Sequence, residues 1–257
     1  MTEKAGRKCV VITGGGSGIG AAAAFAFAQA GYDVVVNYSR NREGADAVAE
    51  RCRSEGVEAI GVLGNIASDA DCRSIAKAAV DRFGRIDALV NNAGVTRYAP
   101  AADLDASNAE DFDHIFDVNV VGTYQMIRAA VPYLKQAALG SVVNVSSDSA
   151  FSGSGSSLAY AASKGAINTM TMGLARTLAP LVRVNAVCPG FVDTTWALSW
   201  HDEASYNDFK SGLIDAAPLK SIPDAADIAD AIVWLTDRAS KVTGQCIVID
   251  SGMHLGA

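Results

Sequence analysis

The sequence predicts an α/β fold built on a doubly wound parallel sheet, and two features of the chain support this prediction. Short β-branched runs alternate with longer alanine-rich segments along the 257 residues. The runs are apolar throughout rather than alternating in polarity, which is typical of parallel strands that helices cover on both faces. Because strands that alternate with helices form βαβ units, we expect one seven-stranded parallel sheet with helices on both faces.

Seven runs are the expected strands, and helical stretches separate them. They cover residues 8–13, 33–38, 58–63, 87–92, 141–147, 182–187 and 245–250. After the sixth run, residues 189–223 show only a weak regular pattern. A connection of this length inside a compact domain usually has a function. We therefore predict a single domain over residues 1–257, with a substrate-loop insertion at about 189–223.

The composition narrows the class of protein. Half of the residues are hydrophobic and 19% are charged, so the chain can bury a sizeable core. A net charge of −7 argues against binding nucleic acid or an anionic membrane, because both need a positive surface. Five scattered cysteines without a Cys-x-x-Cys pair indicate free thiols in a reducing compartment. No segment matches a signal peptide or a membrane span, so we expect a cytoplasmic protein.

The three histidines do not predict a metal site. His114, His201 and His254 lie far apart in the chain and show no His-x-x-x-His spacing. We interpret His114 as a helix-surface residue, and we consider substrate contact for His201 because it lies in the long connection. No metal is expected.

Glycines follow the first expected strand and precede an alanine-rich helix. A phosphate can bind there, on exposed backbone N–H groups and the helix N-terminus. Gly16-x-Gly18-x-x-Ala21 and Gly18-x-Gly20-x-x-Ala23 both fit a loose dinucleotide motif, so the register stays open. The alternative is that these glycines serve only packing, but a strand before them and a helix after them favour a dinucleotide.

The end of the second strand favours NADP over NAD. An acidic residue at this point binds the ribose 2′-hydroxyl of NAD, whereas an arginine accommodates the 2′-phosphate of NADP. The chain has Asn37, Ser39 and Arg40 there and no acidic residue until Glu43. Arg40 could instead be a solvated residue at the start of a helix.

Tyr160 and Lys164 are the candidate acid/base pair. Residues four apart on a helix lie roughly 5–6 Å apart at Cβ, so a phenol and an ammonium can share a pocket. A phenol with a pKa of about 10 is a poor base at neutral pH unless a nearby cation favours the phenolate. Hydride transfer between an alcohol and a nicotinamide needs such a group on the reacting oxygen. The alternative is a surface aromatic beside a surface charge.

Motifs from the first strand to the last decide between these alternatives. In order, they are Thr13-Gly14-x-x-x-Gly18-Ile19-Gly20, NNAG at 91–94, NVSS at 144–147, Tyr160-x-x-x-Lys164, PG at 189–190 and VTGQ at 242–245. In this order and spacing the chain resembles the short-chain dehydrogenase/reductase family nearly end to end. The resemblance implies a single-domain Rossmann fold and a nicotinamide-dependent enzyme. The 3-oxoacyl-acyl-carrier-protein reductases are among the relatives that look closest.

The resemblance implies four catalytic residues. Tyr160 is the general acid/base, and Lys164 lowers the pKa of Tyr160 and holds the nicotinamide ribose. The family's serine lies thirteen residues before the tyrosine, which places it at Ser147, where it orients the substrate oxygen. The family's asparagine, in the helix before the fifth strand, is Asn119, which holds a water that links Lys164 to solvent.

The cofactor contacts implied by the resemblance follow the ends of the strands. Asn65 stands where family members often have an aspartate that contacts adenine, and Thr194 matches a position that binds the nicotinamide carboxamide. The expected set is Gly14, Ser17, Gly18, Ile19, Asn37, Ser39, Arg40, Asn65, Ile66, Asn92, Ala93, Gly94, Tyr160, Lys164, Pro189, Gly190, Val192 and Thr194.

The substrate stays open between three interpretations. We favour an NADP(H)-dependent oxidoreductase that interconverts a small or medium carbonyl and a secondary alcohol. A carrier-protein reductase would need basic residues to dock an acidic partner, and the segments 132–141 and 174–184 carry few. A regulator that senses NADP(H) without chemistry usually loses the tyrosine or the lysine, and this chain keeps both.

Two further expectations concern the surroundings of the site. Aromatic residues of the long connection should close over the substrate as a lid: Phe191, Trp196, Trp200, Tyr206 and Phe209. The helix that carries Tyr160 has small or apolar residues on every face, so it should be buried on more than its sheet side. Because family members commonly associate through this helix, we expect a homodimer or homotetramer.

Overall fold

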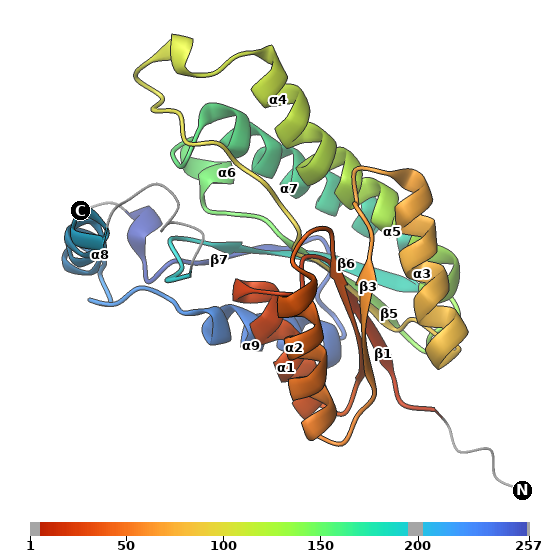
Figure 1. Cartoon of the computed structure of the whole chain (residues 1–257). Coiled ribbons are helices and arrows are strands. Elements are labelled where there is room, and N and C mark those ends of the chain that lie inside the picture. Colours follow the sequence, from red (N-terminus) through yellow and green to blue (C-terminus); the bar gives the residue numbers. More distant parts are fainter. Residues whose placement is uncertain (1–5, 195–202, 256–257) are drawn as a thin grey trace, which may run out of the picture.

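The computed structural model describes residues 6–194 and 203–255, which form one seven-stranded parallel sheet with helices on both faces (Figure 1). The strands are β1 Cys9–Ile12, β2 Asp33–Tyr38, β3 Ala59–Leu63, β4 Ala88–Asn91, β5 Gly140–Val145, β6 Val182–Pro189 and β7 Cys246–Ile249. Each lies within one residue of an expected run or overlaps it, and the fold class is confirmed. The spatial order is β3-β2-β1-β4-β5-β6-β7.

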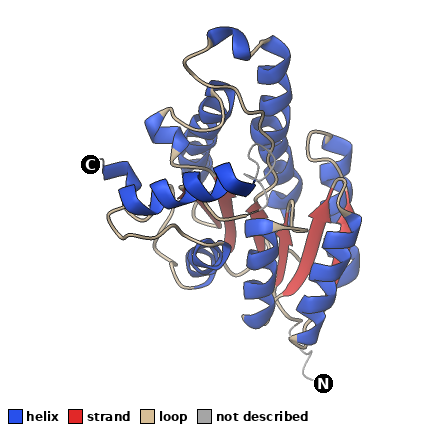
Figure 2. Ribbon diagram, turned by 60° about the vertical axis from the view of Figure 1, so that its left-hand side comes forward, coloured by secondary structure: helices blue, strands red, loops and turns tan. Residues whose placement is uncertain are grey.

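Two helical layers enclose the sheet, and Figure 2 shows the strands between them. The helices α1 Gly18–Gln29, α2 Arg42–Ser54 and α9 Ala225–Asp237 cover one face, and α3 Asp69–Phe83, α5 Thr123–Leu134 and α7 Leu158–Leu178 cover the other. Phe27 and Ile232 are fully buried on the first face, as are Ile75 and Met126 on the second. Burying each such side chain contributes about 1.5–3 kcal/mol.

The two edge strands depart from the expected burial. The residues of β1, β4, β5 and β6 are buried throughout, whereas β7 is half-buried and Leu63 of β3 is exposed. An edge strand has a neighbour on one side only, so helices that cross the sheet centre leave it partly uncovered. The expectation of strands covered on both faces therefore holds for the central strands only.

The connection 189–223 is more regular than its sequence pattern indicates. It contains α8 Glu203–Ala216, a helix of 14 residues that was not expected. Figure 1 shows α8 apart from the helices that cover the sheet, so it needs no strong apolar stripe. Trp196, Trp200 and His201 lie outside the described residues.

The remaining elements surround the carboxyl ends of the strands. They are the 3₁₀ turn η1 Leu104–Ala106, α4 Ala109–Phe116, the π-helical turn η2 Asp117–Gly122, α6 Ser149–Ser152 and the 3₁₀ turn η4 Met253–Leu255. Within the described residues, no helix has the length and apolar character needed to cross a lipid bilayer.

The sheet order reverses between β1 and β4. β1 pairs with β2 on one side and with β4 on the other. The crossovers from these strands leave in opposite directions, which opens a crevice at their carboxyl ends. The crevice is the expected place for a ligand.

Candidate active site

One cavity of about 1090 Å³ lies at the carboxyl ends of the strands. Its wall includes the loop after β1 and the segments after β2, β3, β4, β5 and β6. The structure therefore brings together residues that are far apart in the chain. Every residue of the expected cofactor set lines this cavity, and so does Ser147, whereas Asn119 does not. Their roles as cofactor contacts stay predictions.

The glycine loop explains the open register of the motif. Gly14 and Gly18 have φ values of +61° and +52°, a region that other residues rarely adopt. At Gly20 a Cβ atom would lie 2.4 Å from the carbonyl oxygen of Gly14, so only glycine fits there. The pattern that the backbone requires is thus Gly14-x-x-x-Gly18-x-Gly20.

The start of α1 fits an anionic group. Ser17 is its N-cap residue, yet the Ser17 side chain makes no capping hydrogen bond, and the first turn carries no acidic residue. The N–H groups of the first turn have no partner within a helix, and the helix dipole favours negative charge there. Thr194 lies opposite, because a Cβ at Gly18 would be 3.6 Å from its Cγ2. A dinucleotide diphosphate fits this cradle.

Thr13 and Asn92 hold the loop in place. Thr13 Oγ1 accepts hydrogen bonds from the backbone N–H groups of Asn92 and Ala93, both at 3.0 Å. Asn92 Nδ2 donates to the carbonyl oxygens of Thr13 and Gly14, also at 3.0 Å. The asparagine motif after β4 therefore fixes the shape of the loop after β1, which is a structural role.

The end of β2 presents Ser39 and Arg40 to the cavity, and both are exposed. Arg40 does not start a helix, because α2 begins at Arg42 and Asn41 caps it. No ion pair within the described residues includes Arg40. Asn37 instead joins β2 to the loop after β3, since its Nδ2 donates to the carbonyl oxygens of Val62 and Gly64.

Asn65 forms a turn after β3. Its Oδ1 accepts a hydrogen bond from the backbone N–H of Ala67, and its own N–H donates to Asp71 Oδ2. The side chain is exposed at the cavity and keeps its amide nitrogen for a ligand. Contact with adenine stays a prediction.

Tyr160 and Lys164 both project from the first turns of α7 into the cavity. Ser157 caps this helix by accepting a hydrogen bond from the N–H of Tyr160, which places Tyr160 directly at the helix start. Lys164 Nζ lies 5.4 Å from the centre of the Tyr160 ring and donates to the carbonyl oxygen of Val145 at 2.8 Å. The pair thus shares one pocket, as the spacing predicts.

The pKa directions differ from the expected ones. Burial raises the pKa of Tyr160, while a hydrogen bond from Ser147 acts in the opposite direction. Burial lowers the pKa of Lys164 to about 8. The loss of hydration is the largest cause of both pKa shifts, because the ammonium is bound to the Val145 carbonyl and not to the phenol oxygen. In this state the phenol keeps its proton.

Ser147 lies at the centre of a small polar cluster. Its Oγ is 3.0 Å from Asp148 Oδ1 and 3.0 Å from Ser149 Oγ. The backbone N–H of Ser149 donates to it at 3.2 Å. No sequence pattern singled out Asp148 and Ser149, although both line the cavity. Their position directly after the predicted serine was the available signal.

Asn119 lies in the helical segment that precedes β5, as expected. It lies in the π-helical turn η2, and its side chain is fully engaged by the chain. Its Oδ1 accepts from the N–H of Val95, and its Nδ2 donates to the carbonyl of Val95 and to Ser163 Oγ. It reaches Gly94 beside Lys164, since a Cβ at Gly94 would be 3.3 Å from its Oδ1 and 3.9 Å from Lys164 Nζ. The water that it was expected to hold stays a prediction.

The substrate side of the cavity has one apolar wall. Phe191 and Phe209 line it, with ring centres 5.3 Å apart. Tyr206 does not line the cavity but packs behind Phe191, and its hydroxyl donates to Asp193 Oδ1 at 2.5 Å. Of the expected aromatic lid, the structure therefore places Phe191 and Phe209 at the cavity.

Two histidines lie near the cavity. His114 is exposed on α4, as expected, but it also lines the cavity. His254 Nδ1 lies 2.8 Å from Asp250 Oδ2, beside the end of β7.

Comparisons with known proteins find similarity to one family. The family model described as short chain dehydrogenase matches residues 8–204. A protein of Streptomyces violaceoruber, named for a ketoacyl reductase of the granaticin polyketide synthase, is 39% identical over 249 residues, which are 95% of each chain.

Two solved structures are similar over nearly the whole chain. A short-chain dehydrogenase/reductase from Burkholderia xenovorans superposes with a TM-score of 0.91 at 42% identity, covering 97% of this chain and 99% of the other. A 3-ketoacyl-(acyl-carrier-protein) reductase from Brucella melitensis, complexed with NADH, gives a TM-score of 0.85 at 32% identity, with 96% and 98% covered.

Proposed function

The chain belongs to the short-chain dehydrogenase family of NAD(P)-dependent oxidoreductases, and we propose that it interconverts a small or medium ketone and a secondary alcohol with NADP(H). One observation carries the proposal. Tyr160, Ser147 and Lys164 line the same cavity as the glycine loop at the start of α1. A proton donor and a hydride carrier can therefore reach one substrate carbon and its oxygen.

The chemistry divides between the cofactor and the chain. When bound, the nicotinamide supplies a hydride to the carbonyl carbon or accepts one from the alcohol carbon. Ser147 donates a hydrogen bond to the carbonyl oxygen and orients it. Tyr160 gives its phenolic proton to that oxygen, so that one hydride and one proton convert the carbonyl into an alcohol. Lys164 stabilises the phenolate that remains.

The NADP preference rests on the end of β2. Ser39 can donate a hydrogen bond to a 2′-phosphate, and Arg40 can neutralise it. Both side chains are exposed at the cavity wall. NADH remains the alternative, because a similar reductase from Brucella melitensis was solved with that cofactor.

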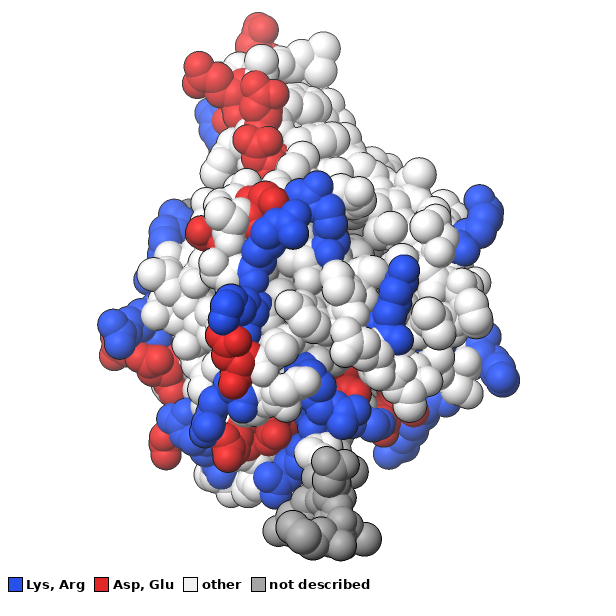
Figure 3. All heavy atoms as spheres, turned by 90° about the vertical axis from the view of Figure 1, so that its right-hand side faces the viewer, with Lys and Arg blue, Asp and Glu red and all other residues white. Residues whose placement is uncertain are grey.

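A reductase of carrier-protein-bound substrates is the second candidate, and the names of similar proteins favour it. The surface beside the cavity opposes it. Acidic residues gather on the end of the molecule that carries η1 and α4 (Figure 3), among them the exposed Asp103, Asp105, Glu110 and Asp113. Arg97 lies nearby, but Asp111 pairs with it. Because α4 lines the cavity through His114, this surface would repel an acidic carrier.

The test measures kcat/KM with NADPH and with NADH for ketones, 3-oxoacyl thioesters and sugars. We expect turnover of ketones with NADPH, and Arg40→Ala should lower kcat/KM for NADPH by about tenfold to a hundredfold, since it removes a charge-assisted contact. The NADH value should stay within about twofold. Nucleotide binding without turnover of any compound would favour a regulator and overturn the proposal.

We further propose that copies of the chain associate as a homodimer or homotetramer in a reducing compartment. The outward face of α7 presents Ala162, Thr169 and Met172, and all three are exposed. The five cysteines form no disulfide. Sedimentation of the purified chain as a monomer would contradict the association.

A further inference from the structure

Asp148 is a carboxylate at the reacting end of the cavity that the proposed chemistry does not use. It follows Ser147 directly, three residues beyond the end of β5, and lines the cavity. It precedes the short helix α6, yet its side chain does not cap that helix. Its Oδ1 lies 3.0 Å from Ser147 Oγ instead. The side chain is therefore directed to the substrate side.

This carboxylate has no cation beside it. No ion pair within residues 6–194 and 203–255 includes Asp148. Burial raises the pKa of Asp148, while hydrogen bonds from the Ser147 hydroxyl and from the N–H and hydroxyl of Ser149 act in the opposite direction. A carboxylate that is mostly removed from water is costly unless donors or a cation compensate for it.

Asp250 offers a comparison, because it also lines the cavity and is satisfied by the chain itself. Its carboxylate accepts hydrogen bonds from the N–H groups of Gly252 and His254, and the His254 ring lies within 3.0 Å of both oxygens. Asp148 has only hydroxyl and backbone N–H donors, from Ser147 and Ser149. A carboxylate has about four acceptor sites, so a ligand that brings a donor can still bind it.

The position of Ser147 limits where such a donor must lie. A carbonyl oxygen bound to Ser147 Oγ sits about 3 Å from it, and Asp148 Oδ1 is 3.0 Å from the same atom. A substituent on the carbon next to the carbonyl is then within reach of the carboxylate. The lining of the cavity includes the polar residues Ser149, Ser154 and Ser156 and the apolar residues Phe191 and Phe209.

We propose that Asp148 determines substrate specificity by accepting a hydrogen bond from a hydroxyl or ammonium group on the carbon next to the reacting carbonyl. The proposal rests on the proposed function, because it takes Ser147 as the residue that binds the carbonyl oxygen. The favoured substrates are then hydroxyketones and vicinal diols, or their amino counterparts. A substrate with a carboxylate in this position is disfavoured, because the negative charge of Asp148 repels it.

The experiment compares four carbonyl probes with NADPH: butanone, 1-hydroxy-2-butanone, protonated 1-(dimethylamino)-2-propanone and 2-oxobutanoate. In the wild-type enzyme, kcat/KM for the hydroxyketone or the ammonium ketone should exceed that for butanone by at least about tenfold, as a hydrogen bond to a charged group predicts. The probe with the higher ratio identifies the donor. The value for 2-oxobutanoate should be lowest.

Two substitutions test the residue itself. Asp148→Leu should bring the ratio of hydroxyketone to butanone close to one. Asp148→Asn keeps an acceptor without the charge, so it should retain the hydroxyketone preference within about threefold, lose any ammonium preference and raise the value for 2-oxobutanoate about tenfold. Asp113→Asn, an exposed carboxylate on α4, is the matched control and should change no ratio.

The outcomes separate this proposal from the proposed function. Turnover of butanone at the same efficiency as the hydroxyketone and the ammonium ketone overturns the role of Asp148 and leaves the enzyme a ketone reductase. A preference that survives in Asp148→Leu does the same. Turnover of thioesters but of none of the four probes overturns it as well. Failure of every carbonyl with both nucleotides overturns the function, and the role of Asp148 with it.

Discussion

The two ends of the parallel sheet use the same kinds of polar side chains in opposite ways. At the amino ends of the strands, charged groups are bound to partners from other elements. At the carboxyl ends, Lys164, Asp148 and Arg40 line a cavity, and none of them belongs to an ion pair within the described residues. The first arrangement holds elements together, and the second leaves charge for a ligand.

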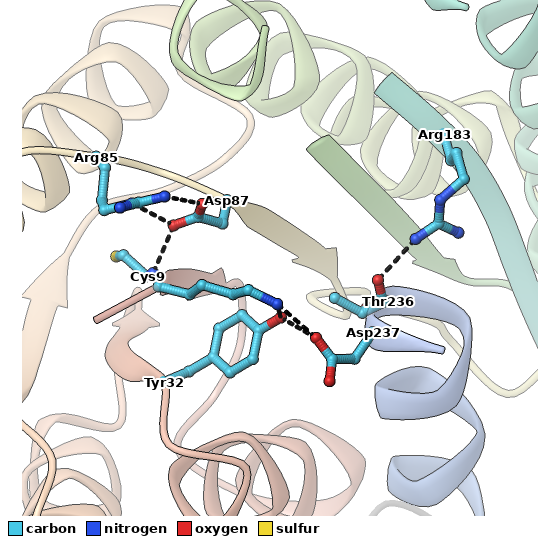
Figure 4. A network of polar contacts seen from close by, with 8 residues as sticks. Cys9, Tyr32, Arg85, Asp87, Arg183, Thr236 and Asp237 are labelled. Carbon is cyan, nitrogen blue, oxygen red and sulfur yellow. Dashed lines mark hydrogen bonds and ion pairs between the residues drawn. The ribbon is translucent and has the colours of Figure 1, made fainter. Parts of the chain in front are cut away.

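Polar contacts link several elements at the amino ends of the strands (Figure 4). Arg85 binds Asp87 through two hydrogen bonds of 2.8 and 2.6 Å, and Asp87 accepts from the N–H of Cys9. Tyr32 donates to Asp237 Oδ1 at 2.9 Å. These contacts join the start of β1 to the start of β4, and the start of β2 to the end of α9. Satisfied polar groups of this kind stabilise a particular packing.

Arg183 is the most deeply buried cation of that network. Its guanidinium donates to the carbonyl oxygens of Leu235 and Thr236 at 2.6 Å and of Val242 at 3.3 Å. These carbonyls belong to the end of α9 and the loop that follows it. Lys164 at the other end is equally buried, but its ammonium has a single carbonyl partner, that of Val145, among the described residues. The cost of burial is therefore compensated more fully for Arg183 than for Lys164, although the Nε atom of Arg183 has no partner in the described part of the chain and burial lowers the pKa of Arg183.

The largest expected effect comes from a substitution in the cavity at the carboxyl ends of the strands. Tyr160→Phe removes the proton donor, so kcat should fall by about 10³-fold, within the range known for general acid catalysis. Steady-state rates with NADPH and the best ketone measure this. The dissociation constant of NADPH and the thermal midpoint should remain close to those of the wild type. Near-normal turnover would contradict the assigned role of Tyr160.

A smaller effect, on stability rather than turnover, is expected at the amino end. Arg183→Met leaves buried carbonyl oxygens without donors, so the free energy of unfolding in urea should fall by about 2–3 kcal/mol. The matched control is Arg73→Met, which removes an exposed pair with Asp69 and should cost less than about 0.5 kcal/mol. Equal losses for the two variants would argue against the difference between the ends. The kcat of folded Arg183→Met should not change.

The smallest expected effect is a pH dependence that belongs to Lys164. Its pKa is lowered from the ordinary 10.5 to about 8 in the folded chain. Between these values the unfolded chain binds more protons, so stability rises with pH. Relative to Lys164→Met, the unfolding free energy of the wild type should increase by about 1 kcal/mol from pH 7 to pH 9. A constant difference between the two proteins would show that burial does not perturb this ammonium.

The cofactor side of the cavity was predictable because it depends on short stretches of chain. Gly14 lies in the loop after β1, Gly18 begins the helix after that loop, and Asn92 follows β4 directly. Parallel strands bring their carboxyl ends to one edge of the sheet. The substrate side was less predictable. Helix α8 has a weak apolar pattern because it does not lie on the sheet, and the part played by Asp148 depends on which way its side chain turns.

Three features are readable from the chain alone: the alternation of strands and helices, the glycine positions and the four-residue spacing of Tyr160 and Lys164. These follow from local propensity and periodicity, which a short window of residues carries. The folded arrangement was needed to show that burial raises the pKa of Tyr160 and lowers that of Lys164. It was also needed to show that Asp148 lies beside Ser147 at the cavity without an ion-pair partner among the described residues. Segments that are distant in the chain determine how deeply a side chain is buried and which charged groups lie beside it, so no local sequence pattern predicts either.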